Sequence, residues 1–211
     1  MESLIPDFRQ LLLTLPPILF ALTVHEFAHA WAANRLGDPT ARMMGRLTMN
    51  PLAHLDPLGT LMIIIAHFGW GKPVPVDVRY LKRPKQDMLW IALAGPASNV
   101  ISAAIFGLTF RYLPDSAFLQ WGEAVAMLHY AVIINLVLAF FNLIPLPPLD
   151  GSKVLAGLLP IRQEMAYRNA EHTLSIVLIV LIIIGSISHI SLIGRVIMPP
   201  VALLARAFMG M

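Results

Sequence analysis

The stretch "VHEFAHAWAA", residues 24–33, places two histidines and a glutamate inside an otherwise apolar run. That run, residues 11–33, is long enough to cross the hydrocarbon of a bilayer, which takes about 20 helical residues. Ionisable side chains at membrane depth cost free energy and are usually paired and functional. His25, Glu26 and His29 therefore predict a functional site within a membrane helix.

The rest of the chain shares this apolar character. Of its 211 residues, 57% are hydrophobic and 13% are charged, whereas a soluble domain carries about 25% charged residues. Apolar windows of membrane-spanning length lie at 9–33, 88–110, 124–146 and 173–194. The sequence predicts an all-α polytopic membrane protein, a bundle of about five to six transmembrane helices in one domain over residues 1–211. The C-terminal membrane helices are expected over 172–209, where the segment 191–209 either spans the bilayer or lies in its interface.

Charge and cysteine content narrow the function classes. The formal net charge of +3 does not indicate a nucleic-acid partner, because excess Lys and Arg in a membrane protein mark its cytoplasmic loops. The chain has no cysteine, so a metal ion would have to be held by histidine, carboxylate or backbone oxygen. Glu2 and Asp7 stand where a cleavable signal would carry basic residues, so we expect the first apolar segment to be retained.

The region between the first two long helices carries different patterns. The first helix is expected to end before Gly37. The segments "MGRLTMN" (44–50) and "KPVPVDVRY" (72–80) alternate in polarity, which predicts a small membrane-associated β-hairpin or sheet. The apolar segment 58–69 would reach only about 18 Å as a helix, short of the hydrocarbon thickness of about 30 Å. We interpret it as a short re-entrant segment.

The distribution of positive charge supports that interpretation. If 58–69 is re-entrant, 12 of the 15 Lys and Arg lie on one side, Arg206 among them, and Arg9, Arg111 and Arg195 lie on the other. If it spans, the best orientation places 10 of the 15 on one side. The positive-inside rule favours the first arrangement, with the amino terminus outside. We expect a multi-pass protein of the cell (inner or plasma) membrane.

The spacing of the first motif suits a metal ion. Residues four apart lie on nearly the same face of a helix, so His25 and His29 can offer nitrogens to one ion while Glu26 faces a water molecule on it. This is the H-E-x-x-H arrangement of two ligands and a general base. The alternative is a pair of histidines satisfied by hydrogen bonds between helices. Inside a membrane helix that alternative is weaker, because Glu26 would need its own compensation.

A catalytic zinc ion also needs a third protein ligand. Asp150 stands out in "FNLIPLPPLDG" (141–151), where three prolines prevent regular helix. Irregular backbone near a membrane is tolerated where it is buried in protein or lines a water-filled cavity. Asp150 is therefore either a ligand presented into a cavity or the N-cap of the helix that follows, and this segment alone leaves both open.

Three motifs together resemble those of the site-2 protease family, the intramembrane zinc metalloproteases of peptidase family M50. They are "HEFAH" (25–29), "AGPASN" (94–99) and "NLIPLPPLDG" (142–151), in the family's order. The resemblance implies one Zn²⁺ per chain, held by two histidines and an aspartate in a catalytic core over 7–155 that faces the cytoplasm. No PDZ-like or CBS-like regulatory domain is evident, so we expect a short bacterial-type member.

The resemblance also assigns roles to single residues. It implies that His25, His29 and Asp150 are the zinc ligands and that Glu26 is the catalytic base.

Further residues are candidates for substrate contact. Asn142 is expected to hold the substrate backbone, and the helix breaks at Pro145, Pro147 and beside Asn99 are where a substrate groove is expected. Asn99 is equally explained as a helix-packing residue. The segment "NPLAHLDPLG" (50–59) resembles a motif of the short bacterial branch.

His54 lies within that last segment. It either approaches the metal as an additional ligand or orders its loop through Asp56, and we favour the second.

The sequence thus predicts an intramembrane zinc endopeptidase that hydrolyses peptide bonds in or near transmembrane segments of other membrane proteins. The bilayer and a transmembrane protein substrate are the expected partners. An aspartyl mechanism would need a second carboxylate at the site, and no G-x-S-x-G element supports a serine mechanism. A metal transporter would carry ionisable residues on several helices. The remaining alternative is a catalytically inactive family member that acts as a membrane scaffold or chaperone.

Overall fold

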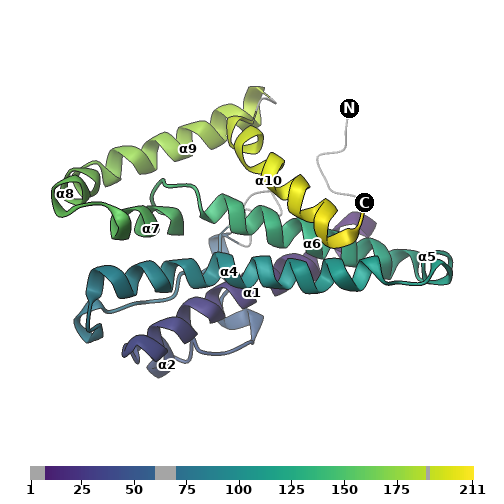
Figure 1. The fold of residues 1–211 in the computed structure, drawn as a ribbon, viewed down its shortest axis with the longest axis horizontal. Coiled ribbons are helices and arrows are strands. Elements are labelled where there is room, and N and C mark those ends of the chain that lie inside the picture. Colours follow the sequence, from purple (N-terminus) through teal and green to yellow (C-terminus); the bar gives the residue numbers. More distant parts are fainter. Residues whose placement is uncertain (1–7, 60–69, 189–190) are drawn as a thin grey trace.

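A computed structural model describes residues 8–59, 70–188 and 191–211 of the protein (Figure 1). The predicted re-entrant segment 58–69 lies, apart from its first two residues, outside these ranges. The described elements are α1 (Phe8–Leu36), α2 (Thr40–Met43), the 3₁₀ turns η1 (Pro51–Ala53) and η2 (Val78–Tyr80), α4 (Pro84–Arg111), α5 (Asp115–Gln120), α6 (Gly122–Asn142), α7 (Asp150–Leu158), α8 (Ile161–Asn169), α9 (Glu171–Ser188) and α10 (Leu192–Met209).

Four of these helices, α1, α4, α6 and α10, are long and apolar enough to cross a membrane. The consecutive helices α8 and α9 meet at an angle of 58° and would make a fifth span if they count as one broken helix. The predicted windows at 9–33 and 88–110 fall within α1 and α4, and the window 124–146 covers most of α6 but extends past its end at Asn142. The prediction of an all-α polytopic architecture is confirmed.

The centre of the molecule is the packing of α1, α4 and α6 against one another (Figure 1). Alanines fill the contacts: Ala21, Ala30 and Ala33 on α1 and Ala92 and Ala103 on α4 are almost completely buried. Helices in a membrane gain little from hydrophobic burial, because lipid tails are as apolar as leucine. Small residues let the backbones approach closely, so dispersion contacts stabilise the bundle.

The last helix, α10, packs across α4 and α6. Its Val201, Ala205 and Met209 join one buried cluster with residues of those two helices. The helix α10 runs continuously through Pro199 and Pro200. Prolines are tolerated in membrane helices where neighbouring helices and local adjustments satisfy the freed backbone groups.

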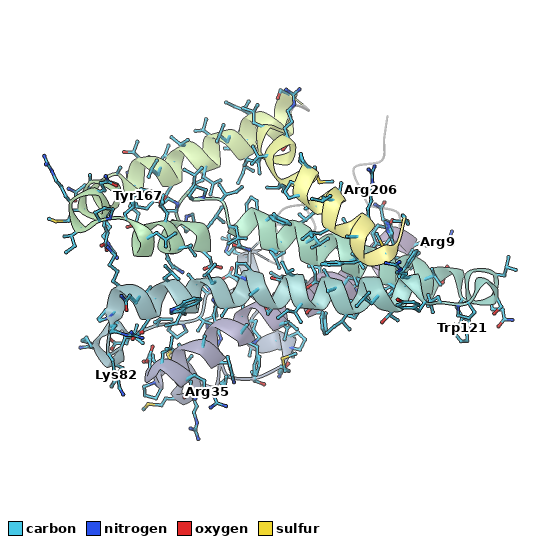
Figure 2. The ribbon with its side chains drawn as sticks, viewed as in Figure 1. Arg9, Arg35, Lys82, Trp121, Tyr167 and Arg206 are labelled. Carbon is cyan, nitrogen blue, oxygen red and sulfur yellow. The ribbon has the colours of Figure 1, made fainter. Side chains whose placement is uncertain are left out.

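Charged residues gather at the two ends of the long helices (Figure 2). Arg9 forms an ion pair of 3.1 Å with Glu123 at one end, and Arg35 and Lys82 lie at the opposite end (Figure 2). Arg206 lies in the last turn of α10, and the end of α10 packs against the end of α4, where Gly210 lies beside the Arg111 side chain. The charge count had placed Arg206 and Arg111 on opposite sides, whereas the structure places them at the same end of the bundle.

The turn after α1 follows the predicted pattern. Gly37 has a φ of +111°, a left-handed conformation that costs other residues free energy. It lets the Asp38 N–H donate to the Ala33 carbonyl at 2.9 Å, so that one open helix carbonyl is satisfied. The Asp38 carboxylate then accepts the Thr40 N–H at 2.9 Å. The first helix therefore ends where the sequence predicted.

The predicted β-hairpin is wrong for the part of the chain that the structure describes. In those ranges the β-type pairing is a single antiparallel bridge between Leu55 and Gly71. Pro73 and Pro75 interrupt the second predicted strand, and proline has no N–H to donate to a ladder. The alternation in polarity over 72–80 is real, but it belongs to an extended segment and not to a strand.

Side chains take the place of a partner strand along this extended segment. The Arg46 guanidinium donates to the carbonyls of Lys72 and Pro73. The Asp77 N–H donates to Asp38 Oδ2 at 2.7 Å. Backbone groups are therefore paired without a sheet, and the segment is held against the turn and the loop that follow α1.

Candidate metal centre

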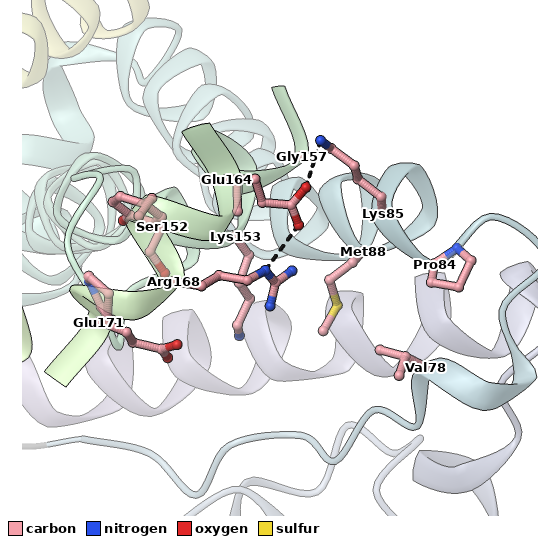
Figure 3. Close-up of a pocket in the computed structure, with 13 residues that line it drawn as sticks. Val78, Pro84, Lys85, Met88, Ser152, Lys153, Gly157, Glu164, Arg168 and Glu171 are labelled. Atoms are coloured by element: carbon pink, nitrogen blue, oxygen red, sulfur yellow. Dashed lines mark hydrogen bonds and ion pairs between the residues drawn. The ribbon is translucent and has the colours of Figure 1, made fainter. Parts of the chain in front are cut away.

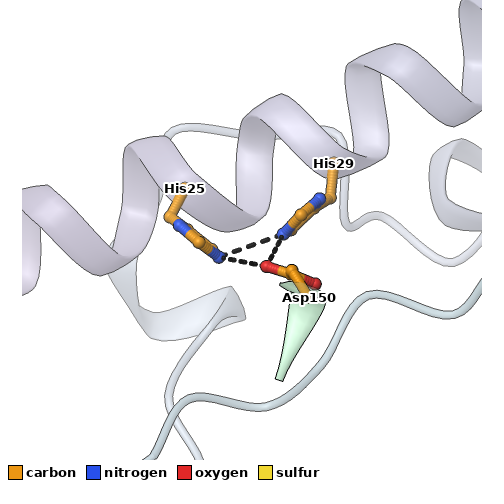
Figure 4. Close-up of side chains that lie close together, drawn as sticks. All are labelled: His25, His29 and Asp150. Atoms are coloured by element: carbon orange, nitrogen blue, oxygen red, sulfur yellow. Dashed lines mark hydrogen bonds and ion pairs between the residues drawn. The ribbon is translucent and has the colours of Figure 1, made fainter. Parts of the chain in front are cut away.

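Three side chains meet between α1 and the start of α7 (Figure 4). The Nε2 atoms of His25 and His29 lie 3.1 Å and 3.0 Å from Asp150 Oδ2, and 3.0 Å from each other. All three side chains are buried, with exposed fractions of 4%, 7% and 6%. The fold thus brings an aspartate to two histidines that precede it by 125 and 121 residues.

Helix geometry places the histidines, and a glycine places the aspartate. The two histidines are one turn apart on α1. Asp150 is the first residue of α7. A Cβ on Gly151 would lie 2.3 Å from the Leu143 carbonyl oxygen, so only glycine allows α7 to start so close to the preceding loop. The N-cap position belongs to Leu149, which makes no side-chain capping bond, and the Asp150 carboxylate faces the histidines.

A second glycine leaves room for the imidazoles. A Cβ on Gly95 of α4 would lie 2.4 Å from His29 Nε2 and 2.7 Å from His25 Cε1. Both rings therefore pack directly against the backbone of α4. The glycine of the "AGPASN" motif is required by this close approach.

Hydrogen bonds set the orientation of both rings. His29 Nδ1 lies 2.7 Å from the Ile91 carbonyl, which only accepts, so the proton is on Nδ1 and the lone pair is on Nε2. His25 Nδ1 lies 2.6 Å from Asn99 Oδ1, which likewise accepts. Metal-binding histidines are commonly held in this way. Both Nε2 atoms are thus available to one ion.

The electrostatics of the site favour a cation. Burial raises the pKa of the Asp150 carboxyl, but the adjacent imidazoles of His25 and His29 outweigh burial and hold that pKa below its usual range. The carboxylate is therefore ionised, with Lys153 Nζ at 3.5 Å on its other oxygen.

In a tetrahedral zinc site with bonds of about 2.0–2.1 Å, ligand atoms lie about 3.3 Å apart. The observed separations are a few tenths of an ångström shorter, so the residues present fit zinc.

Glu26 lies beside this group and contacts a different segment. Its Oε2 accepts the Val74 N–H at 3.2 Å, and a Cβ on Gly71 would lie 3.7 Å from its Oε1. Pro73 and Pro75 have no N–H, so Val74 supplies the only amide between them. The extended segment therefore positions the Glu26 carboxylate.

The structure places His54 in its loop and not in the metal-binding group. The imidazole is almost completely buried, and its Nε2 donates to the Thr48 carbonyl at 2.8 Å. The expected partner Asp56 instead accepts the Gly59 N–H at 2.8 Å. His54 is thus held within its own loop by the Thr48 carbonyl.

The residues expected to line a substrate groove each make a different contact in the structure. Asn99 contacts His25, as above. Asn142 donates to the Leu138 carbonyl of its own helix at 3.0 Å. The Tyr167 hydroxyl donates to the Pro145 carbonyl at 3.0 Å, which ties the proline-rich loop to α8.

Pro147 lines a cavity of about 410 Å³ between the first turn of α4, α7 and α8 (Figure 3). Glu164 at its rim pairs with Lys85 at 2.7 Å and with Arg168 at 3.0 Å. Lys153 belongs both to this cavity and to the surroundings of Asp150. The cavity lies beside α7, and through Lys153 it borders the residue that contacts the histidines.

Sequence reasoning missed two residues of the site. Val74 acts through its backbone, so no side-chain pattern could reveal it. Asn135 on α6 lies buried next to Asn99, with Asn99 Nδ2 2.9 Å from its Oδ1. A polar residue inside the apolar window 124–146 is the sequence signal that could have identified Asn135.

Comparison with known proteins agrees with this geometry. The family model described as peptidase family M50 matches residues 112–185. YwhC of Bacillus subtilis, provisionally named a zinc metalloprotease, is 40% identical over 170 residues, which cover 79% of this chain and 78% of YwhC.

Two mycobacterial proteins named Rip2, which carry the same provisional description, are also similar. Rip2 of Mycolicibacterium smegmatis is 33% identical over 81% of this chain and 66% of its own length. Rip2 of Mycobacterium tuberculosis H37Rv is 32% identical over 77% of this chain and 63% of its own length. No solved structure matches the chain. The resemblance seen in the motifs is confirmed: the chain belongs to peptidase family M50, the site-2 protease family of zinc metalloproteases.

Proposed function

We propose that this protein is an intramembrane zinc endopeptidase that hydrolyses peptide bonds in or near transmembrane segments of other membrane proteins. The observation that carries the proposal is the meeting of His25, His29 and Asp150 on buried faces of helices, one of which is apolar enough to cross a membrane. Glu26 follows the first histidine on the same helix. Ionisable groups at such a depth are usually functional.

The three buried side chains would hold one Zn²⁺ per chain. Two neutral imidazoles and one carboxylate form a ligand set that is known from catalytic zinc sites, which leave a fourth position open. The chemistry that zinc supplies there is Lewis-acid polarisation of a water molecule and of a carbonyl oxygen. The chain's own groups orient the imidazoles, through Ile91 and Asn99.

Glu26 would move the protons of the reaction. Its carboxylate would take a proton from the attacking water and pass it to the nitrogen of the leaving amine. The Val74 N–H, at 3.2 Å from Oε2, holds the carboxylate in one orientation and leaves its other oxygen free to accept a proton. A positioned general base of this kind contributes roughly 10²- to 10⁴-fold to the rate.

Hydrolysis consumes water, so the site needs a polar route to the aqueous phase. Lys85, Lys153 and Glu164 line a cavity beside α7, and Lys153 also contacts Asp150, which supports such a route. Most basic loops share that end of the molecule, which supports a catalytic centre toward the cytoplasm and an amino terminus outside. A substrate helix would have to unwind near the proline-rich loop that precedes Asp150, with Asn142 as a hydrogen-bonding partner for its backbone.

The test is cleavage in vesicles with a matched variant. Purified wild type and Glu26→Gln are reconstituted with a panel of single-span reporter proteins whose spans carry Gly or Asn-Pro pairs. Product masses then locate the cut. We expect the wild type to cut in or near the span, while Glu26→Gln binds zinc equally and releases no product.

Two results would overturn the proposal. Cleavage by Glu26→Gln at the wild-type rate would remove the assigned general base. Zinc-loaded wild type that leaves the whole panel intact would favour the scaffold or chaperone alternative.

A further inference from the structure

A chain of buried side-chain amides runs from α6 through α4 to the metal centre on α1. Asn135 and Asn99 are both 0% exposed. Asn99 Nδ2 lies 2.9 Å from Asn135 Oδ1, and Asn99 Oδ1 lies 2.6 Å from His25 Nδ1. We propose that Asn135 is a positioning residue that fixes the tautomer of His25 through Asn99 and so sets the affinity of the site for zinc. The inference rests on the proposed function of the site.

The orientation of Asn135 follows from its own helix. Its Nδ2 donates to the Ala131 carbonyl at 2.8 Å. A carbonyl oxygen only accepts, so the nitrogen of the Asn135 amide must be the atom on that side. The Oδ1 atom is then the one that faces Asn99.

The orientation of Asn99 follows from two acceptors. Its Nδ2 lies 3.0 Å from the Ala21 carbonyl and 2.9 Å from Asn135 Oδ1, so each of its two N–H groups has one acceptor. A flipped Asn99 amide would face both acceptors with an oxygen and leave them without a donor. Buried polar groups without partners cost free energy, so the amide oxygen of Asn99 is directed to His25.

The state of His25 follows in turn. Because Asn99 presents an oxygen, His25 must carry its proton on Nδ1, and the lone pair then lies on Nε2. That atom is the one beside Asp150 Oδ2. Without Asn135 the Asn99 amide loses one of the two acceptors that prevent its flip, so a tautomer with the proton on Nε2 becomes accessible and competes with the metal.

Metal affinity is the quantity that this relay controls. Loss of an outer partner of a metal-binding histidine typically weakens binding by about 10- to 100-fold. We expect Asn135→Leu to weaken zinc binding by a factor within that range, although Asn135 touches no ligand. Leucine keeps a similar volume and removes the acceptor.

The experiment compares zinc dissociation constants of detergent-purified full-length proteins by competition with a chelator. The variants are Asn135→Leu, Asn99→Leu and the double substitution. Val132→Ala is the matched control, because Val132 is fully buried one turn away on α6 and belongs to an apolar cluster. Thermal unfolding of the zinc-free proteins measures any loss of stability separately.

We expect a specific pattern. Asn135→Leu and Asn99→Leu both weaken zinc binding, and the double variant binds as weakly as Asn99→Leu alone, because two steps of one relay are not additive. Val132→Ala unfolds at a lower temperature and binds zinc as the wild type does.

Each other result overturns the inference. A folded Asn135→Leu with wild-type zinc affinity would show that the relay does not reach the metal. Additive losses in the double variant, or an equal loss in Val132→Ala, would reduce Asn135 to a packing residue. A wild type that binds no zinc would overturn the proposed function as well. The three results for the variants would overturn the relay and leave the proposed function unaffected.

Discussion

A Gly95→Ala substitution would place a methyl group inside the metal centre. The added carbon would lie 2.4 Å from His29 Nε2, 2.6 Å from its Cε1 and 2.7 Å from His25 Cε1. Non-bonded carbon atoms prefer a separation of about 3.5–4.0 Å, so the rings would have to move by about 1 Å. Ligand distances in metal sites hold to within about 0.2 Å. The required movement is several times larger than that tolerance.

We therefore expect Gly95→Ala to lose zinc while it remains folded. Alanine favours a helix over glycine by about 1 kcal/mol, so α4 itself gains. The loss in zinc affinity should exceed the roughly 10- to 100-fold that follows removal of an outer partner, because the ligand atom itself is displaced. The assay is zinc content and chelator competition on the detergent-purified protein, with circular dichroism to follow helix content.

The same helix supplies a matched control. A Cβ on Gly107 would lie 2.5 Å from Phe208 Cβ on α10, a similar clash about 18 Å further along α4. Gly107→Ala should lower the unfolding temperature and leave zinc affinity unchanged. Wild-type zinc affinity in Gly95→Ala would refute the reasoning, because the imidazoles would then not occupy the space beside this glycine.

Further changes test other parts of the site. Glu26→Gln should keep one zinc and lower the cleavage rate by about 10²- to 10⁴-fold. Elemental analysis measures the zinc and the vesicle assay measures the cleavage rate. Undiminished cleavage would contradict the role of Glu26. Val74→Pro removes the N–H at Glu26 Oε2, a hydrogen bond to a charged group worth about 1.5–3 kcal/mol. Cleavage should fall at least tenfold at constant zinc content, and an unchanged rate would show that this bond does not position the base. Removal of metal by a chelator should abolish cleavage and lower the unfolding temperature, because a ligand of the native state stabilises it by mass action. Added zinc should restore both the cleavage and the unfolding temperature. A metal-free enzyme that still cleaves would contradict the zinc mechanism.

The helices and the two-histidine face followed from local rules that the sequence states directly. Hydropathy over about 20 residues located α1, α4 and α6, and the spacing of His25 and His29 put both on one face. Asp150 was a different case. Its segment left a ligand and an N-cap equally open, because nothing in the local sequence tells how α7 lies against α1.

The extended segment shows why the hairpin prediction failed. Alternating polarity over 72–80 suits a strand, but a strand also needs a partner with free backbone groups. Here the partners are the side chains of Arg46, Asp38 and Glu26, which are distant in the sequence. Pairings of this kind depend on the tertiary fold and leave no periodic signal.

The relay through Asn135 was hidden for a related reason. An asparagine in an apolar helix marks a polar contact with another helix, but its partner is set by how α4 and α6 rotate against each other. The position of Arg206 relative to Arg111 was hidden likewise, because hydropathy alone does not tell whether the last helix returns across the membrane.

The central claim is that two segments far apart in the sequence form one zinc site. The most direct measurement is the zinc content, by elemental analysis, of the detergent-purified wild type beside His25→Ala and Asp150→Ala. If the two segments form one zinc site, the wild type carries one zinc per chain and both variants lose most of it, with helix content unchanged. No zinc in the wild type, or full zinc in Asp150→Ala, would contradict that claim.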